Sequence, residues 1–196
     1  AIDIADAQGA YIIWNHPGWP DNKSTFYPVH DELIKAGKID AYEAYNYTES
    51  YPLTFDWYAQ YGIAPMANTD IHGTTAIDYG CEKGWMRPMT LVFAAERTEA
   101  SLREALEAKR TLAFFFGNLV GDQQYLSKLV SASLQTRPVG DRLEVTNVSD
   151  ITYRMTQGDA LYVFPAGKTV LIKAPQGELS VQNCFWGNGK NLTYTF

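Results

Sequence analysis

The chain has 196 residues, of which 46% are hydrophobic and 14% aromatic, so it can bury a core and does not have the composition of a disordered protein. Its 16 basic and 22 acidic residues give a net charge of −6 without any run of lysine or arginine, which argues against nucleic acid as a partner. No stretch approaches the ~18 consecutive apolar residues of a membrane span, so a membrane is not an expected partner either.

The first part of the chain alternates short apolar runs with helical patterns. The runs predict strands over residues 11–14, 39–45, 63–68, 88–94 and 112–116. The helical patterns cover residues 2–8, 28–36, 50–61 and 98–109. Glycines at positions 9, 37 and 62 follow three of these helices, where a left-handed residue commonly ends a helix. Strand–helix alternation of this kind indicates parallel βα units.

Four or five βα units are too few for a closed barrel, which typically needs ~250 residues. The first helix also begins without a capping residue or a first turn. We therefore expect part of a barrel whose N-terminal half is missing, with an unpaired strand edge at residues 11–14. The long segment 70–87 is predicted to be a functional loop.

The pattern changes after Gly117. A short helix is predicted over residues 122–130, and β-rich runs follow at residues 143–148, 169–174, 179–186 and 191–196. Turn residues separate these runs, and Asn188-Gly189 is a strong hairpin signal. The fold class is therefore predicted as α/β plus all-β, with a partial barrel over residues 1–118 and a small β-sandwich over residues 119–196.

Three polar residues follow the ends of predicted strands. His16 comes after residues 11–14, and Asp70 and His72 come after residues 63–68. Loops after the carboxyl ends of barrel strands are where catalytic groups are placed. Residues two apart in extended chain point to the same side, and carboxylate with imidazole can bind a divalent metal ion. The alternative is that Asp70 caps a turn and that the two histidines pack within their loops.

Other polar and aromatic residues are less decisive. His30 is assigned to the first turn of a helix and is left out of the site. Glu43 lies within a strand and faces either the interior or solvent. Arg87 either meets an anionic substrate or is a solvated charge, and Trp19 either walls a pocket beside His16 or lies at the rim of the core.

Three motifs carry a resemblance to a known family. They are Tyr11-Ile12-Ile13-Trp14-Asn15-His16-Pro17-Gly18-Trp19-Pro20, Ile39-Asp40-Ala41-Tyr42-Glu43-Ala44-Tyr45-Asn46 and Asn68-Thr69-Asp70-Ile71-His72-Gly73. In this order they resemble the later half of the PHP (polymerase and histidinol phosphatase) family, and more narrowly bacterial PHP proteins with an added C-terminal β domain. The resemblance covers about residues 1–116 and implies a distorted (βα)7 barrel.

The resemblance also implies an activity. His16, Asp70 and His72 match metal ligands of the family, whose site holds up to three ions and hydrolyses a phosphate mono- or diester by metal-bound hydroxide. Zn, Mn or Fe suits such ligands. Trp19 and Arg87 are the expected substrate-binding residues, and a phosphorylated small molecule is the expected substrate. The location implied is periplasmic or extracellular, with the cytoplasm as the alternative.

The family's early motifs, including a His-x-His pair, are absent from this sequence. We therefore expect the missing N-terminal half of the same polypeptide to complete the site. On its own the fragment is expected to be inactive and to lack some or all of the ions.

A second function remains open at this point. The chain could be a non-catalytic carbohydrate- or protein-binding module built on the β-sandwich, with Phe185, Trp186 and Tyr194 as an aromatic platform. At strand spacing these rings are equally typical of a core. A metal assay separates the two functions, because a glycan-binding module does not need His16, Asp70 and His72 together.

Overall fold

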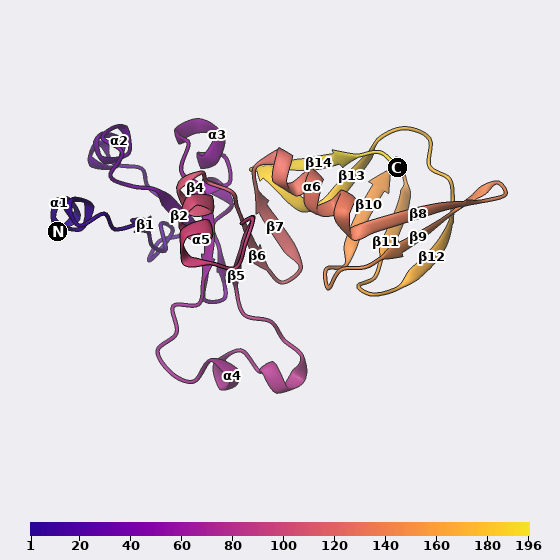
Figure 1. Ribbon diagram of the computed structural model, residues 1–196, viewed down its shortest axis with the longest axis horizontal. Helices are drawn as coiled ribbons and strands as arrows, with labels where there is room; N and C mark the ends of the chain where they lie inside the picture. The colour runs from indigo at the N-terminus through magenta and orange to yellow at the C-terminus, as the bar shows by residue number, and fades with distance from the viewer.

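The structure is a computed structural model that describes all residues from 1 to 196. The molecule is elongated, with the N-terminal helices and a small parallel sheet at one end and the C-terminal strands at the other (Figure 1). The segment between β4 and β5 extends away from the strands and carries α4 (Thr75–Asp78) and a 3-10 turn over Cys81–Lys83. No helix has the length and apolar character needed to cross a membrane.

A parallel sheet forms the N-terminal part. It contains β1 (Ile13–Trp14), β2 (Ala41–Asn46) and β4 (Ala64–Asn68), and β1 and β4 both pair with β2 in parallel. A short strand, β3 (Glu49–Ser50), pairs with β2 in the antiparallel direction. The carboxyl ends of β1, β2 and β4 consequently meet at one edge of the sheet. The outer side of β1 has no strand neighbour, as the sequence predicts.

Two of the predicted N-terminal helices are confirmed within one or two residues. They are α1 (Ile2–Ala7) and α2 (Pro28–Lys35), and each is followed closely by a glycine with positive φ. Pro28 occupies the first helical position, where its missing N–H leaves no hydrogen bond unmade.

The prediction of a helix over residues 50–61 is wrong in its first half. Only α3 (Trp57–Tyr61) is α-helical, and a 3-10 turn over Pro52–Thr54 precedes it. Ser50 is held in β3 by its pairing with Tyr45, so the chain cannot begin a helix there. Apolar spacing over residues 53–61 does not reveal this pairing.

The parallel pattern also stops earlier than predicted. β5 (Met89–Val92) and β6 (Thr111–Phe115) enclose α5 (Glu99–Glu107), yet they pair in the antiparallel direction. Val92 lies opposite Thr111, so the segment containing α5 leaves and returns at the same end of the strands. The sequence order of strand, helix and strand therefore describes a hairpin with an inserted helix, and the prediction of a parallel unit here is wrong.

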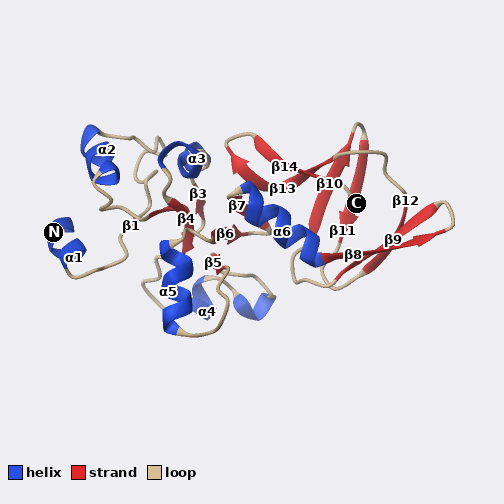
Figure 2. Cartoon of the chain, turned by 45° about the horizontal axis from the view of Figure 1, so that its top comes forward, coloured by secondary structure: helices blue, strands red, loops and turns tan.

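Two further sheets make up the C-terminal part (Figure 2). The larger has seven strands, ordered β11 (Ala160–Phe164), β10 (Tyr153–Gln157), β13 (Leu179–Gly187), β7 (Asn118–Gly121), β6 and β5, with β14 (Lys190–Tyr194) paired to β13. The smaller contains β12 (Thr169–Lys173), β9 (Arg142–Asn147) and β8 (Leu134–Val139). The hairpin predicted at Asn188-Gly189 is confirmed between β13 and β14.

One helix, α6 (Gln123–Ser133), covers this part and shares its core with strands of both sheets. The Asp122 side chain caps it by accepting a hydrogen bond from the backbone N–H of Gln124. The helix thus begins where the sequence predicts and runs three residues further.

The β6–β7 hairpin connects the two parts through its two faces. Leu112, Phe114 and Leu119 belong to the C-terminal core. Ala113, Phe115 and Val120 belong to the N-terminal core. Both faces are buried because successive strand residues point to opposite sides. The fold is thus mixed α/β and rich in sheet, while the (βα)7 barrel, the sandwich and a domain boundary near residue 118 stay predictions.

Candidate functional site

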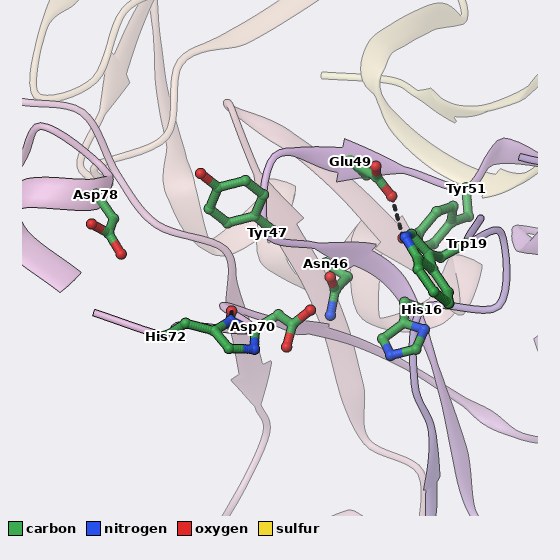
Figure 3. A pocket seen from close by; sticks show the side chains of 9 residues that line it. All are labelled: His16, Trp19, Asn46, Tyr47, Glu49, Tyr51, Asp70, His72 and Asp78. Carbon is green, nitrogen blue, oxygen red and sulfur yellow. Dashed lines mark hydrogen bonds between the residues drawn. The ribbon is translucent and has the colours of Figure 1, made fainter. Parts of the chain in front are cut away.

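A cavity of about 520 Å³ lies at the carboxyl ends of β1, β2 and β4. Its lining residues are His16, Trp19, Asn46, Tyr47, Glu49, Tyr51, Asp70, His72 and Asp78. Figure 3 shows that Asp70 and Asn46 lie between His16 and His72 in that view. The structure thus brings the three predicted metal ligands and Trp19 into one pocket, although the loop with His16 and Trp19 is far in sequence from the loop with Asp70 and His72.

Two of the predicted metal ligands have an unusual backbone. His16 has φ 29° and Asp70 has φ 45°, both in the left-handed region that residues other than glycine rarely adopt. Such a conformation costs on the order of 1–3 kcal/mol per residue and is concentrated at functional sites. Asn15 separates His16 from the end of β1, and Thr69 separates Asp70 from the end of β4, so both residues lie in turns that follow parallel strands.

His72 is oriented by a hydrogen bond to its own loop. Its Nδ1 lies 2.7 Å from the backbone carbonyl oxygen of Asp70. Because a carbonyl oxygen can only accept, Nδ1 is the donor in this contact, and in the neutral imidazole Nε2 is then the nitrogen with a free lone pair. Metal-binding histidines are typically held in this way, by a backbone carbonyl or carboxylate on the ring nitrogen that does not bind the ion.

Glu43 does not line the pocket itself but is hydrogen-bonded to two of its lining residues, and it is only 2% exposed. Its carboxylate accepts hydrogen bonds from Asn46 Nδ2 and Asn68 Nδ2, each at 2.8 Å, and from the backbone N–H of His16. The structure therefore resolves the two alternatives left by the sequence, because Glu43 faces the interior. Asn46 ends β2 just as His16 and Asp70 follow β1 and β4, and this position is the signal that could have placed Asn46 in the site.

Two aromatic side chains, Tyr51 and Trp19, line the pocket on the side of His16 (Figure 3). The Tyr51 hydroxyl donates to Glu49 Oε2 at 2.6 Å (Figure 3), and burial together with this carboxylate raises the pKa of Tyr51. Gly18 packs on the Tyr51 ring so closely that an added Cβ would lie 2.3 Å from it. Trp19 is 65% exposed, and its ring centroid lies 5.8 Å from that of His16. Tyr51 is thus a fixed donor, and Trp19 is free to contact a ligand.

Arg87 and His30 lie outside this pocket. Arg87 lines a separate hollow beside Trp85 and Met86, and its guanidinium donates to the Pro88 carbonyl oxygen at 3.4 Å. Its predicted role in substrate binding stays a prediction. His30 Nδ1 accepts from the backbone N–H of Tyr27 at 3.2 Å within α2, and burial lowers its pKa.

The pocket suits a cation. Glu49, Asp70 and Asp78 contribute carboxylates, while no lysine or arginine lines the cavity. Two imidazoles and a carboxylate form a donor set suited to Zn, Mn or Fe. However, no three His, Cys, Asp or Glu side chains lie close enough together to hold one ion. The residues therefore fit metal binding in their chemistry and are distributed along the pocket rather than around one point.

Comparison with protein families and with characterised proteins finds no match. Among solved structures, the chain is similar to a PHP-like metal-dependent phosphoesterase. That structure is a two-domain protein from Bacteroides vulgatus ATCC 8482, described as containing a predicted phosphoesterase of this kind, with a TM-score of 0.91 and 28% sequence identity. The similarity covers 100% of this chain and 64% of the other, and it supports a PHP-like relation.

Proposed function

We propose that this chain belongs to a PHP-type metal-dependent phosphoesterase that hydrolyses a phosphate mono- or diester. The observation that carries the proposal is the convergence of His16, Asp70 and His72 on one pocket, with Nδ1 of His72 already engaged by the Asp70 carbonyl oxygen and Nε2 without a protein partner. The similarity to a predicted PHP-like phosphoesterase supports the same class.

The roles of the residues follow from their positions. His16, Asp70 and His72 would hold divalent ions such as Zn, Mn or Fe. Such ions supply a Lewis acid for the phosphoryl oxygens and lower the pKa of a water molecule. Trp19 would flank the substrate, because its ring is exposed beside His16. With no lysine or arginine in the lining, the negative charge of the ester would be met at the ions rather than by this chain's side chains.

The distribution of the donors suggests more than one ion. Because the three proposed ligands are spread along the pocket, each would need additional metal ligands beside it to hold an ion. No three His, Cys, Asp or Glu side chains of this chain lie close enough together to hold one ion. We therefore propose that an N-terminal part of the same polypeptide adds the remaining ligands and completes a (βα)7 barrel next to the free edge of β1. The C-terminal sheets would then form the supporting β-sandwich.

The proposal is tested by hydrolysis of bis-p-nitrophenyl phosphate and p-nitrophenyl phosphate by the natural full-length protein supplied with Mn²⁺ or Zn²⁺. Asp70→Ala and His72→Ala should each lower kcat/KM more than ~100-fold. Loss of a residue that only hydrogen-bonds to a metal ligand typically lowers activity by ~10–100-fold, and loss of the ligand itself should lower it further. Asp159→Ala, an exposed carboxylate in the turn between β10 and β11, is the matched control and should retain activity.

Equal activity in the wild type and in both ligand variants would refute the assignment of the site. Absence of hydrolysis together with binding of glycans or of a protein would instead favour the binding-module function.

A further inference from the structure

We propose that Glu43 is the positioning residue of this site. Its single buried carboxylate joins the ends of three parallel strands and fixes the direction in which His16 enters the pocket. The inference rests on the proposed function only in treating His16 as a metal ligand.

The contacts of Glu43 reach all three strands. Oε2 accepts from the backbone N–H of His16, in the turn after β1, and from Asn46 Nδ2, at the end of β2. Oε1 accepts from Asn68 Nδ2, at the end of β4. Removing this carboxylate would therefore release three segments at once, and each of them carries or precedes a lining residue of the cavity.

The bond to His16 is the one that bears on metal binding. His16 has a left-handed backbone, which does not persist unless surrounding contacts hold it. Its N–H is fixed by Glu43, and this contact sets the orientation of the residue whose imidazole lines the cavity. A register shift between Glu43 and Tyr45 in the pairing of β2 with β4 redirects the strand at this point.

The charge of Glu43 gives a second argument. Glu43 takes part in none of the seven ion pairs of the structure, although it is 2% exposed. A buried carboxylate without a cationic partner is unfavourable unless hydrogen bonds or a nearby cation compensate it. The adjoining pocket contains further carboxylates and no lysine or arginine, so a bound cation is the compensating charge that this arrangement favours.

The first test follows the His16 amide and ring by NMR in the natural full-length protein without added metal. Glu43→Gln keeps the shape of the side chain and one acceptor oxygen. The substituted side chain can donate from its amide nitrogen to Asn68, provided that the Asn68 amide rotates so that its oxygen faces position 43. Glu43→Ala removes every acceptor. We expect the His16 amide proton to move strongly upfield in the alanine variant and to stay close to its wild-type position in the glutamine variant.

The second measurement is the affinity for Mn²⁺ or Zn²⁺ by titration calorimetry. Loss of a residue that orients a ligand typically lowers metal affinity by ~10–100-fold, and we expect a loss of this size in Glu43→Ala. Asn147→Ala is the matched control, because Asn147 is also buried and donates two hydrogen bonds, but within the C-terminal part. It should lower stability without changing the His16 signals or the affinity.

Several outcomes would overturn the inference. They are unchanged His16 signals in Glu43→Ala, unchanged metal affinity in a protein that binds metal, or an equal loss in Asn147→Ala. Should Glu43→Ala fail to fold, Glu43→Asp is the second variant, because it keeps the charge but shortens the side chain by one methylene and so moves the carboxylate away from His16. The same upfield shift of the His16 amide proton and the same loss of metal affinity are then expected. A protein that binds no metal while His16 still responds to Glu43 would refute the proposed function and leave the positioning role standing.

Discussion

Buried asparagines serve different purposes in the two parts of the molecule. In the C-terminal sheets, Asn147 and Asn183 are almost fully buried, and their amide groups donate only to backbone carbonyl oxygens. At the end of the parallel sheet, Asn46 and Asn68 donate instead to the carboxylate of Glu43. The same side chain thus satisfies loop backbone in one part and supports a buried charge in the other.

This difference separates structural from functional polar groups. A buried amide that bonds to backbone stabilises the fold and needs no ligand. A buried carboxylate that has only hydrogen-bond donors around it, beside a cavity with further acidic groups, leaves a local negative charge that a bound cation can balance. We therefore expect that disruption of the C-terminal part changes stability alone, and that disruption around Glu43 changes ligand binding.

The largest effect on stability is expected from Leu126→Ala. Leu126 in α6 is fully buried in the C-terminal core, and truncation of such a leucine lowers the free energy of unfolding by ~2–5 kcal/mol. Urea denaturation measures this change. Leu161→Ala is the control, because Leu161 is 62% exposed and its truncation should have little effect. Loss of metal binding by folded Leu126→Ala protein would contradict the separation of the two parts.

Asn183→Leu should have the next largest effect. It leaves the carbonyl oxygens of Gly117 and Thr152 without their donor, and the N–H of Arg154 without its acceptor. Unsatisfied buried groups cost ~1–3 kcal/mol, so a fall of about 2 kcal/mol in the free energy of unfolding is expected. Gln135→Ala on exposed β8 provides the comparison. A change below that of Gln135→Ala would show that water replaces these bonds.

A smaller, pH-dependent effect is expected from His30. Burial lowers its pKa, so between that pKa and about 6.5, the usual value, the unfolded chain binds more protons than the folded chain. Stability contributed by neutral His30 is present above pH 6.5 and is lost as the pH falls through the lowered pKa. His30→Asn can keep an acceptor for the Tyr27 N–H and should reduce this pH dependence in urea denaturation. An unchanged pH profile in the variant would assign the effect to other groups.

The smallest effect is expected where the two parts touch. Lys190 Nζ lies 2.7 Å from Asp56 Oδ1, and their side chains are 47% and 20% exposed. A partly exposed pair contributes less than about 1 kcal/mol, so Lys190→Ala should lower the urea midpoint only slightly. One transition should remain, because the β6–β7 hairpin still joins both cores. Two separate transitions would show that the ion pair is essential to this connection.

The sequence predicts the meeting of these strand-end residues better than it predicts the full topology. β1, β2 and β4 end near the predicted positions, so His16, Asp70 and His72 converge as expected from parallel strand ends. Glu43 could not be placed, because a buried carboxylate and a solvated one look alike in a strand pattern. Its partners on β2 and β4 become visible only when the register is known.

Errors in the fold have a common cause. Ser50 is held by a strand partner, and β5 returns to β6 as a hairpin, although local periodicity indicated helix and parallel crossover in these places. Both depend on which strands pair, and pairing is set by tertiary contacts rather than by local propensity. The C-terminal hairpin was predictable because Asn188-Gly189 encodes its turn locally.

The most direct test is the metal content of the natural full-length protein, measured by elemental mass spectrometry beside Asp70→Ala. Asp70 follows β4 with a left-handed backbone, lines the pocket and orients His72 through its carbonyl oxygen. We expect bound Zn, Mn or Fe in the wild type and a clear fall in metal content in the variant, with both proteins folded. Equal metal content in the two proteins, or none in either, would contradict the assignment of this pocket as a metal centre.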